Sequence, residues 1–231
     1  EHRAPGIHAS EVSGCERRIV YSLLNYPRSG GGTDNTWRKR FMMGTAVHEM
    51  LQGEFHKWAV RSKYCVTFQD EVTIAPHLQQ MAAKWHIFSH CDGMFVVRNS
   101  WDGPALFRVL LEIKTMSPNE FKDLKAPKEE HIDQSHIYMA CLDVPMIWLL
   151  YWNKGNQNTT GTDNPNFLVR FNQRRWSELE AKFERVHQAA ALEKLPDREE
   201  SVRCEFCAFS HHCQPTILNR VGNGQPRKWA L

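Results

Sequence analysis

The segment ALFRVLLEIKT, residues 105–115, is the feature that most constrains how this chain can fold. Its apolar residues predict a buried strand, yet Glu112 and Lys114 place two opposite charges within it. Side chains two residues apart on a strand point to the same face of a sheet. One face of the strand therefore carries both charges, and Ile113 points to the other. Because buried charges need partners, we expect further polar groups to meet this pair.

The composition is that of a globular protein. The chain has 231 residues, 42% of them hydrophobic, which is enough for one large domain with its own core. The sequence contains no run of 18 or more apolar residues that could span a membrane. The first residues lack the apolar core of a secretory signal, so we expect a cytoplasmic protein. The net charge of +3 does not by itself predict a nucleic-acid partner.

Helices and strands alternate in the predicted structure, with mobile polar loops at 27–35 and 154–166. We expect helices at 8–25 (Ser10 as N-cap), 36–60, 76–85, 128–142 and 174–193 (Ser177 as N-cap). We expect strands at 64–74, 91–97, 105–115, 144–152 and 167–171, the second and third as a hairpin and the last at an edge. A single domain, 1–231, would comprise a helical part (10–60), a sheet core (64–172) and a C-terminal helix with a cysteine-containing tail (173–231).

Asp92 is the first candidate partner for the charged pair. It lies in the strand CDGMFVV, and the hairpin would bring that strand beside the one that holds Glu112. Two carboxylates that meet in this way repel each other unless a cation lies between them, and carboxylate oxygens are the ligands that Mg²⁺ and Mn²⁺ select. Lys114 would then flank the metal and stabilise charge on a phosphate. The alternative is an ordinary ion pair on a half-exposed sheet face.

Three further polar residues lie on predicted helices. His48 falls on the apolar stripe of the helix at 36–60, together with Phe41, Leu51, Phe55 and Trp58. It is either a core histidine with a satisfied hydrogen bond or a further metal ligand. Gln134 and Tyr138 are four residues apart, so they project from the same side of the helix at 128–142. Taken alone, these two residues are surface groups that form hydrogen bonds.

The order of these elements is more informative than any one of them. GTAVH, CDG, LLEIKT and QSHIY follow one another in the chain, and this arrangement resembles the PD-(D/E)XK nuclease superfamily, in particular its RecB-like branch. The resemblance implies a restriction-endonuclease-like α/β core, a mixed central sheet flanked by helices. It implies that Mg²⁺ or Mn²⁺ binds to His48, Asp92, Glu112 and the backbone carbonyl of Ile113. Lys114 would be the catalytic lysine, and Gln134 and Tyr138 would contact the DNA backbone or support the site. The sequence departs from the family in having Cys91 where a proline often precedes the aspartate.

The tail contains a second possible metal site. The segment CEFCAFSHHC places Cys204, Cys207 and Cys213 in a C-x2-C-x5-C arrangement, and seven cysteines in a chain with no export signal favour thiols or metal ligands over disulfides. Zinc would take these three cysteines with His211 or His212. An iron–sulfur cluster would need a fourth cysteine, and Cys15 is the candidate. Cys65, Cys91 and Cys141 are then expected to be buried thiols.

One early cysteine and a late C-x2-C-x5-C that bracket a RecB-like core resemble the iron–sulfur nucleases, which include AddB and the Cas-four family. In that family a [4Fe–4S] cluster joins the N- and C-terminal regions, and we expect Cys15, Cys204, Cys207 and Cys213 to bind one here. The tail has few large apolar residues besides Phe206 and Phe209, so burial alone would hardly hold it. Candidate DNA-binding residues lie in basic segments near the N-terminus: Arg17, Arg18, Trp37, Arg38, Lys39 and Arg40.

The sequence therefore predicts a metal-dependent deoxyribonuclease. By resemblance we expect an exonuclease that acts on single-stranded DNA or DNA ends in recombination, repair or CRISPR spacer processing, with protein partners from those processes. The alternative is a DNA-binding or interaction module that has the nuclease fold and does not cleave. A weaker alternative is an RNA-binding protein held together by zinc.

Overall fold

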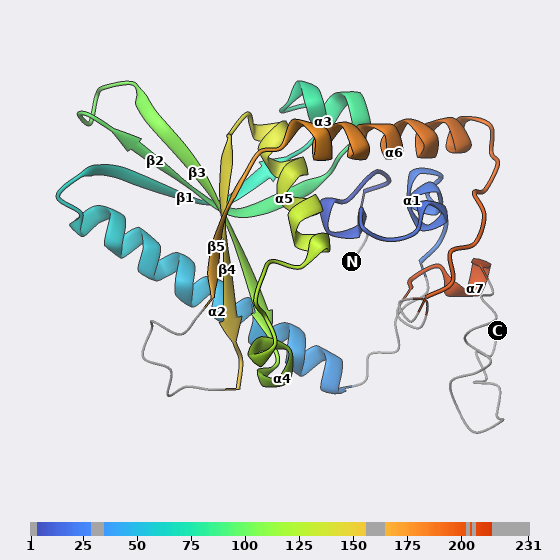
Figure 1. The fold of residues 1–231 in the computed structure, drawn as a ribbon, viewed down its shortest axis with the longest axis horizontal. Helices are drawn as coiled ribbons and strands as arrows, with labels where there is room; N and C mark the ends of the chain where they lie inside the picture. The colour runs from blue at the N-terminus through green and yellow to red at the C-terminus, as the bar shows by residue number, and fades with distance from the viewer. Residues whose placement is uncertain (1–3, 29–34, 156–164, 202–203, 205–206, 214–231) are drawn as a thin grey trace.

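A five-stranded mixed sheet forms the centre of the computed structural model, which describes residues 4–28, 35–155, 165–201, 204 and 207–213 (Figure 1). The strands are β1 (Cys65–Ile74), β2 (Ser89–Arg98), β3 (Ala105–Met116), β4 (Met146–Asn153) and β5 (Asn166–Arg170). They follow one another across the sheet in chain order. β3 and β4 are parallel, and every other pair of neighbours is antiparallel. The predicted hairpin and the predicted edge strand are thus confirmed.

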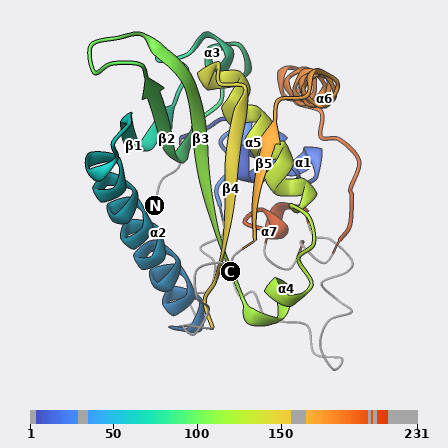
Figure 2. The ribbon, with the colours of Figure 1, turned by 60° about the vertical axis from the view of Figure 1, so that its left-hand side comes forward.

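Helices cover both faces of the sheet (Figure 2). The long helix α2 (Asn35–Arg61) lies on one face, and α5 (Glu129–Leu142) lies on the other, with α6 (Gln173–Ala191) and α1 (Glu16–Leu23) beyond it. The shorter helices are η1 (Ala9–Glu11), α3 (Gln80–Trp85), α4 (Pro118–Lys122) and α7 (Ser210–Cys213). Among the described residues, no helix is long and apolar enough to cross a membrane.

The core is divided by the sheet. On the α2 face, Leu51 packs with Phe68, Phe95 and Leu111. On the opposite face, a larger cluster joins α5, α6 and α1 and includes the fully buried Phe183. The strand β3 contributes to both clusters because its side chains alternate between the two faces. This double burial fixes the strand that carries Glu112 and Lys114.

Three local predictions are wrong. The N-cap of α6 is Asn172, whose side chain accepts a hydrogen bond from the backbone N–H of Arg175 at 3.1 Å, whereas the Ser177 hydroxyl donates to a carbonyl inside the helix. Ser10 lies in the 3₁₀ turn η1, and Cys15 is the N-cap of α1. Trp58 is 53% exposed because it lies near the end of α2, where it touches only the rim of the core through Phe95.

Apolar burial holds the cysteine-containing tail against α1, contrary to the sequence-based expectation. The ring of Phe209 is fully buried, and its centroid lies 5.5 Å from that of Tyr21 on α1. The guanidinium of Arg28 lies 5.0 Å from the centre of the same ring and bonds to the buried carboxylate of Glu11. The two ends of the described chain therefore meet through side-chain contacts. Of the remaining cysteines, Cys91 and Cys141 are buried as expected, but Cys65 is only half-buried.

Candidate active site

A cleft of about 1350 Å³ runs between α2 and the sheet. Its walls come from α2, from β1, from the end of β3 and from the segments that follow β3 and β4. The residues that line it include His48, Gln52, Glu71, Thr115 and Lys154. Glu112 and Lys114 lie on β3, whose end reaches this cleft, but they do not line it, and with side chains 5% and 19% exposed the charged pair is largely buried and not exposed on a flat face.

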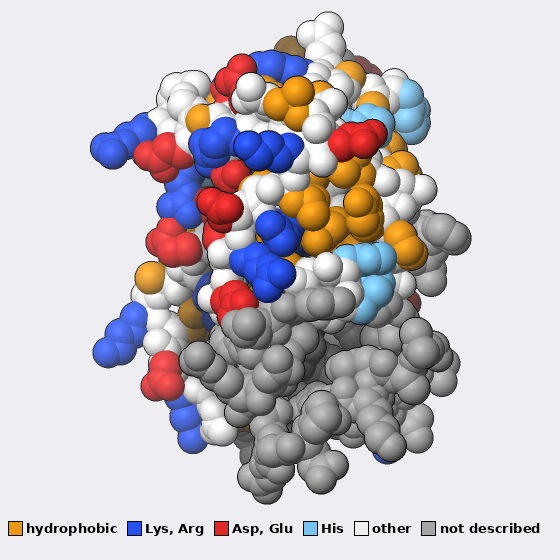
Figure 3. Space-filling model, turned by 90° about the vertical axis from the view of Figure 1, so that its right-hand side faces the viewer, with side chains coloured by type: hydrophobic (Ala, Val, Ile, Leu, Met, Phe, Trp, Pro, Cys, Tyr) orange, Lys and Arg blue, Asp and Glu red, His pale blue; other side chains and the backbone are white. Residues whose placement is uncertain are grey.

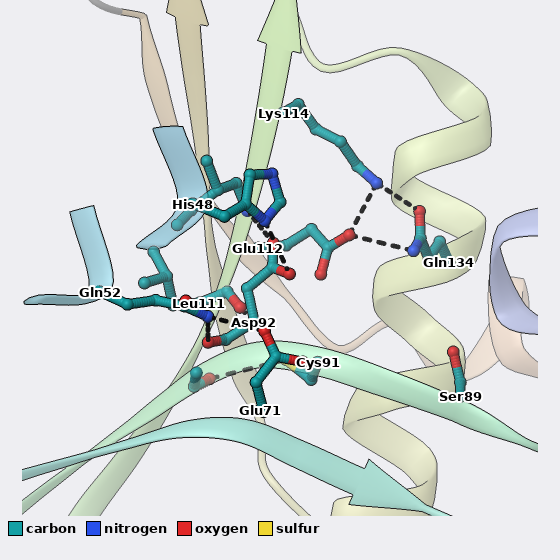
Figure 4. A network of polar contacts seen from close by, with 12 residues as sticks. His48, Gln52, Glu71, Ser89, Cys91, Asp92, Leu111, Glu112, Lys114 and Gln134 are labelled. Carbon is teal, nitrogen blue, oxygen red and sulfur yellow. Dashed lines mark hydrogen bonds and ion pairs between the residues drawn. The ribbon is translucent and has the colours of Figure 1, made fainter. Parts of the chain in front are cut away.

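Asp92 ends the pairing of β2 with β3. The ladder between these strands runs as far as Gly93 and Leu111, and beyond it the Asp92 carboxylate accepts a hydrogen bond from the backbone N–H of Ile113 at 2.6 Å. The second oxygen of the carboxylate lies 3.2 Å from Nδ1 of His48 on α2 (Figure 4). A side chain at Gly93 would clash with the Phe68 ring at 2.5 Å, so glycine allows β1 to approach here. The structure thus brings Asp92, His48 and the Ile113 backbone together.

Glu112 is buried, with 4% of its surface exposed. One carboxylate oxygen accepts hydrogen bonds from Nζ of Lys114 at 2.7 Å and from Nε2 of Gln134 at 3.0 Å. Among the described residues the other oxygen has no hydrogen-bond partner, and it turns away from Lys114 and Gln134 towards Asp92 (Figure 4). A buried carboxylate oxygen without a partner is costly, so this atom fits a missing ligand.

A chain of hydrogen bonds on α5 fixes the charged pair from behind. Gln134 accepts from Lys114 through Oε1 at 2.7 Å, and its Nε2 donates to the Tyr138 hydroxyl at 2.6 Å. That hydroxyl in turn lies 3.4 Å from the hydroxyl of Ser89 on β2. The amide of Gln134 is therefore held in one orientation, with its acceptor towards Lys114 and its donor towards Glu112. Ser89 is a member of this chain that the sequence did not suggest.

Burial and neighbouring charge shift the proton affinities in the site. Burial, and next the charge of Asp92, raise the pKa of Glu112 to about 7, although Lys114 acts in the opposite direction. Burial lowers the pKa of His48, but the hydrogen bond to Asp92 and its charge outweigh burial, so the pKa rises above the ordinary value. Burial also raises the pKa of Tyr138 well above its usual range, which keeps its hydroxyl protonated. Groups with shifted pKa values in a cleft are typical of functional sites.

Besides Ser89, two further residues of the site, Gln52 and Glu71, were missed at the sequence level. Nε2 of Gln52 on α2 donates to the backbone carbonyl of Asp92 at 2.8 Å and to the carboxylate of Glu71 on β1 at 2.9 Å. Glu71 stands opposite Asp92, at the one place where the paired residues of β1 and β2 skip a position. Its φ of 45° lies in the left-handed region, which a glutamate rarely occupies in a strand. The signal in the sequence was Gln52, one turn of helix after His48.

The carboxylate and imidazole groups of the site are of the type that binds a divalent cation, but they are not positioned around a common point. Within the part of the chain that the structure describes, no three His, Cys, Asp or Glu side chains are placed to hold a metal ion. His48 instead contacts Asp92, and Lys114 contacts Glu112, as charged groups do when they neutralise each other directly. The unpartnered oxygen of Glu112 and the hard carboxylate donors nevertheless suit Mg²⁺ or Mn²⁺.

The predicted DNA-binding residues are not gathered in one place. Arg17 donates from Nε to the carbonyl of Pro196 at 2.7 Å, and Arg18 bonds to Glu11 at 3.0 Å, so both join parts of the chain. On the face over α1, α6 and α7, acidic and basic side chains are intermixed (Figure 3). Lys39 is exposed and lines the cleft. The side chains of Trp37, Arg38 and Arg40 lie outside the described residues.

The four cysteines from the two chain ends lie around common cavities. Cys15, Cys204, Cys207 and Cys213 line a space of about 20 Å³, and the first three also line a neighbouring cavity of about 500 Å³. Burial raises the pKa values of Cys15 and Cys207, and the nearby thiols act in the same direction. The smaller space has room for about one water-sized group, and Cys213 does not line the larger one. In the arrangement that the structure describes, these four thiols are not placed to hold a metal ion. His211 and His212 are not among the described residues that line either space.

Comparison with known proteins shows the fold. No protein-family model matches the chain, and no curated protein sequence matches it. A crystal structure of SSO0001 matches with a TM-score of 0.52 at 15% identity, over 92% of this chain and 87% of that one. The alkaline exonuclease LHK-Exo from Laribacter hongkongensis matches with a TM-score of 0.55 at 12% identity, over 83% and 90%. LHK-Exo in complex with dAMP matches equally well at 14% identity, over 82% and 90%. The chain therefore shares the fold of an alkaline exonuclease.

Proposed function

We propose that this protein is a metal-dependent deoxyribonuclease that acts as an exonuclease on single-stranded DNA or DNA ends. The observation that carries the proposal is the buried, unpartnered oxygen of Glu112, which turns towards Asp92 next to the cleft that His48 lines, with Lys114 on the same strand. The fold shared with LHK-Exo, an alkaline exonuclease, supports the same reading. Recombination, repair or CRISPR spacer processing would be the setting, with protein partners from those processes.

Asp92, Glu112, His48 and the carbonyl of Ile113 would hold one or two Mg²⁺ or Mn²⁺ ions. The N–H and C=O of a strand residue leave by the same edge, so the Ile113 carbonyl faces Asp92 as its N–H does. When bound, such an ion lowers the pKa of a coordinated water and neutralises charge on a phosphate. Asp92 and His48 would have to part slightly for both to reach the same ion.

Lys114 would act on the reacting phosphate. Its Nζ is held between Glu112 and Gln134, and 19% of the side chain remains exposed. A water molecule attacks the phosphorus atom, the bond from phosphorus to the 3′-oxygen breaks, and the 3′-oxygen leaves and takes up a proton. The ammonium group stabilises the negative charge that develops on the phosphoryl oxygens. Gln134 and Tyr138 would keep Lys114 and Glu112 in place.

Hydrolysis of labelled DNA tests this proposal directly. We expect purified protein to release nucleotides from linear single-stranded DNA with Mn²⁺ or Mg²⁺, and to release none with EDTA, because the carboxylates need a cation between them. Comparing 5′- and 3′-labelled strands, single and duplex, gives polarity and strand preference. Metal-independent DNA binding without cleavage, under all these conditions, would instead support a non-cleaving module.

Separately, we propose that Cys15, Cys204, Cys207 and Cys213 bind a [4Fe–4S] cluster that joins the two ends of the chain. Support comes from the small cavity that cysteines from both ends line, together with Arg17, Arg18 and Arg198, whose positive charge would offset that of thiolates. Cys15 also stands at the N-terminus of α1, where backbone N–H groups stabilise negative charge. Because Phe209 already packs against Tyr21, the cluster would add to this contact.

Absorption spectroscopy distinguishes the cluster from zinc. Protein purified without oxygen is expected to be brown, with an absorption band at about 400 nm. Cys204→Ala should remove this band, since an iron–sulfur cluster needs all its thiolates. Cys141→Ala, a thiol on α5 remote from the cavities, is the matched control and should keep the colour. Colourless protein that contains one zinc per chain would show that the four cysteines form a zinc site.

A further inference from the structure

The two ends of the cleft carry opposite charge. Lys39 and Gln52 both line it, and Gln52 follows Lys39 by thirteen residues, which corresponds to about 20 Å along α2. Towards the start of α2 the walls contain Lys39, Thr115, Ser117 and Lys154. Towards the end of α2 they contain Glu49, Asp70 and Glu71. His48 and its partner Asp92 lie between the two ends.

Backbone contacts fix the position of Lys154 at the basic end of the cleft. The backbone N–H of Lys154 donates to the carbonyl of Met116 at the end of β3, at 3.0 Å. The next residue, Gly155, lies so close to Pro118 that a Cβ would fall 2.1 Å from the proline ring. Lys154 is thus tied to the wall of the cleft. Glu120 also lines this end, but its carboxylate already accepts from Lys128 and from the Ser117 hydroxyl.

The acidic end of the cleft contains a residue, Glu71, with an unusual backbone conformation. Glu71 keeps a left-handed backbone in the middle of β1, which a non-glycine residue rarely adopts, while Gln52 donates a hydrogen bond to its carboxylate. Asp70, the adjacent residue, lies 3.5 Å from His56, and both side chains are about half-exposed. Glu49 on α2 is exposed to the same end. Three carboxylates therefore border the cleft just past Asp92.

We infer that this asymmetry makes the protein select strand ends: the uncut strand lies along the Lys39 and Lys154 end, and the terminal nucleotide lies against Glu49 and Asp70. A strand that continued past the reacting phosphate would place further phosphates beside these carboxylates, and like charges at such distances repel. A terminal nucleotide has no further phosphate to place there. The inference deepens the proposed nuclease function and rests on it.

Circular and linear DNA test the acidic end. Wild-type protein should degrade linear single-stranded DNA and leave a circle of the same sequence nearly uncut. The double variant Glu49→Gln with Asp70→Asn should raise the rate on the circle relative to the linear strand by about fivefold to tenfold, because two repelling charges are gone. The control, Glu54→Gln with Asp143→Asn, makes the same charge change outside the residues that line the cleft and should keep the wild-type ratio.

Binding without cleavage tests the basic end. In EDTA, Lys39→Ala with Lys154→Ala should weaken binding of a fluorescent single strand and reduce the slope of log affinity against log salt by about 1.4, or about 0.7 for each lost phosphate contact. Lys57→Ala with Lys63→Ala, outside the cleft lining, should leave the slope unchanged.

The outcomes separate this inference from the proposed function. Wild-type cleavage of circles as fast as linear strands would overturn the inference and the exonuclease mode, and would leave metal-dependent DNA hydrolysis as the part of the proposed function that stands. The inference also falls if the acidic double variant changes only the Mn²⁺ concentration required, since the carboxylates would then act on the cation. Absence of any DNA cleavage would remove the proposed function and the inference together.

Discussion

Replacing Lys114 by alanine is expected to lower the rate of DNA hydrolysis by about a thousandfold, since one pre-positioned group at the developing charge contributes about 10²–10³ in rate and loss of Lys114 also releases its partners. Its Nζ is held at 2.7 Å from both Glu112 and Gln134, so the ammonium group is already in place before substrate binds. The measurement is single-turnover cleavage of labelled single-stranded DNA with saturating Mn²⁺. Affinity for DNA in EDTA should change far less.

Lys128→Ala is the matched control for this prediction. Lys128 is also a lysine paired with a glutamate, at 3.1 Å from Glu120, but it lies just before α5 and not on β3. We expect its replacement to leave the cleavage rate within about twofold of wild type, as surface ion pairs contribute little. Cleavage by Lys114→Ala at the wild-type rate would show that this lysine has no part in the chemistry.

The metal-free protein should lose stability as the pH rises, because of Glu112. Burial and the charge of Asp92 raise the pKa of this carboxyl from 4.5 to about 7 in the folded protein. Between these two values the folded state binds more protons than the unfolded state, so the free energy of unfolding falls with increasing pH. Below pH 4.5 both states are protonated, and above pH 7 the loss is complete, at up to about 3 kcal/mol.

Urea denaturation in EDTA at several values between pH 5 and pH 8 measures this loss. Glu112→Gln, which cannot ionise, should flatten the curve over that range, whereas Glu184→Gln on the exposed surface of α6 should reproduce the wild-type curve. Adding Mn²⁺ should restore stability to wild type at pH 8, where the carboxylate is ionised, and should have little effect on Glu112→Gln. If the free energy of unfolding of wild type in EDTA does not change with pH, Glu112 is not a buried carboxylate with a raised pKa.

The secondary structure was largely readable from the sequence. Alternating or continuous runs of apolar residues located all five strands, and the short turn segment at 99–104, which contains Asp-Gly, located the β2–β3 hairpin, because side-chain pattern and turn chemistry are local properties. Helix starts were less readable. Ser177 and Asn172 are both capping residue types, and the choice between them depends on where the chain leaves β5. The helix α4 was missed, although Ser117 and Glu120 form a capping box that the sequence contains.

The candidate site was readable in part. Asp92, Glu112, Lys114 and Gln134 are near one another, as the order of the motifs predicted. The sequence did not reveal Glu71 and Gln52 as members of the site. Glu71 lies where the pairing of β1 and β2 skips a position, and Gln52 reaches this place from α2, so both roles depend on tertiary structure. Arg17 and Arg18 were candidate DNA-binding residues in the sequence, but Arg18 bonds to the nearby Glu11, and Arg17 bonds to the carbonyl of Pro196, a remote residue that only folding brings near.

By itself, the sequence determined that Glu112 and Lys114 share a face of one strand, since the two-residue repeat of a strand holds in any fold. It also determined that Gln134 and Tyr138 share a side of one helix. Only the tertiary structure decided that Glu112 is buried with one oxygen unpartnered, and that the cleft is basic at one end and acidic at the other. Burial and charge asymmetry depend on which distant segments of the chain pack together. Burial sets the proton affinity of Glu112, and the charge asymmetry sets the proposed path of a DNA strand through the cleft.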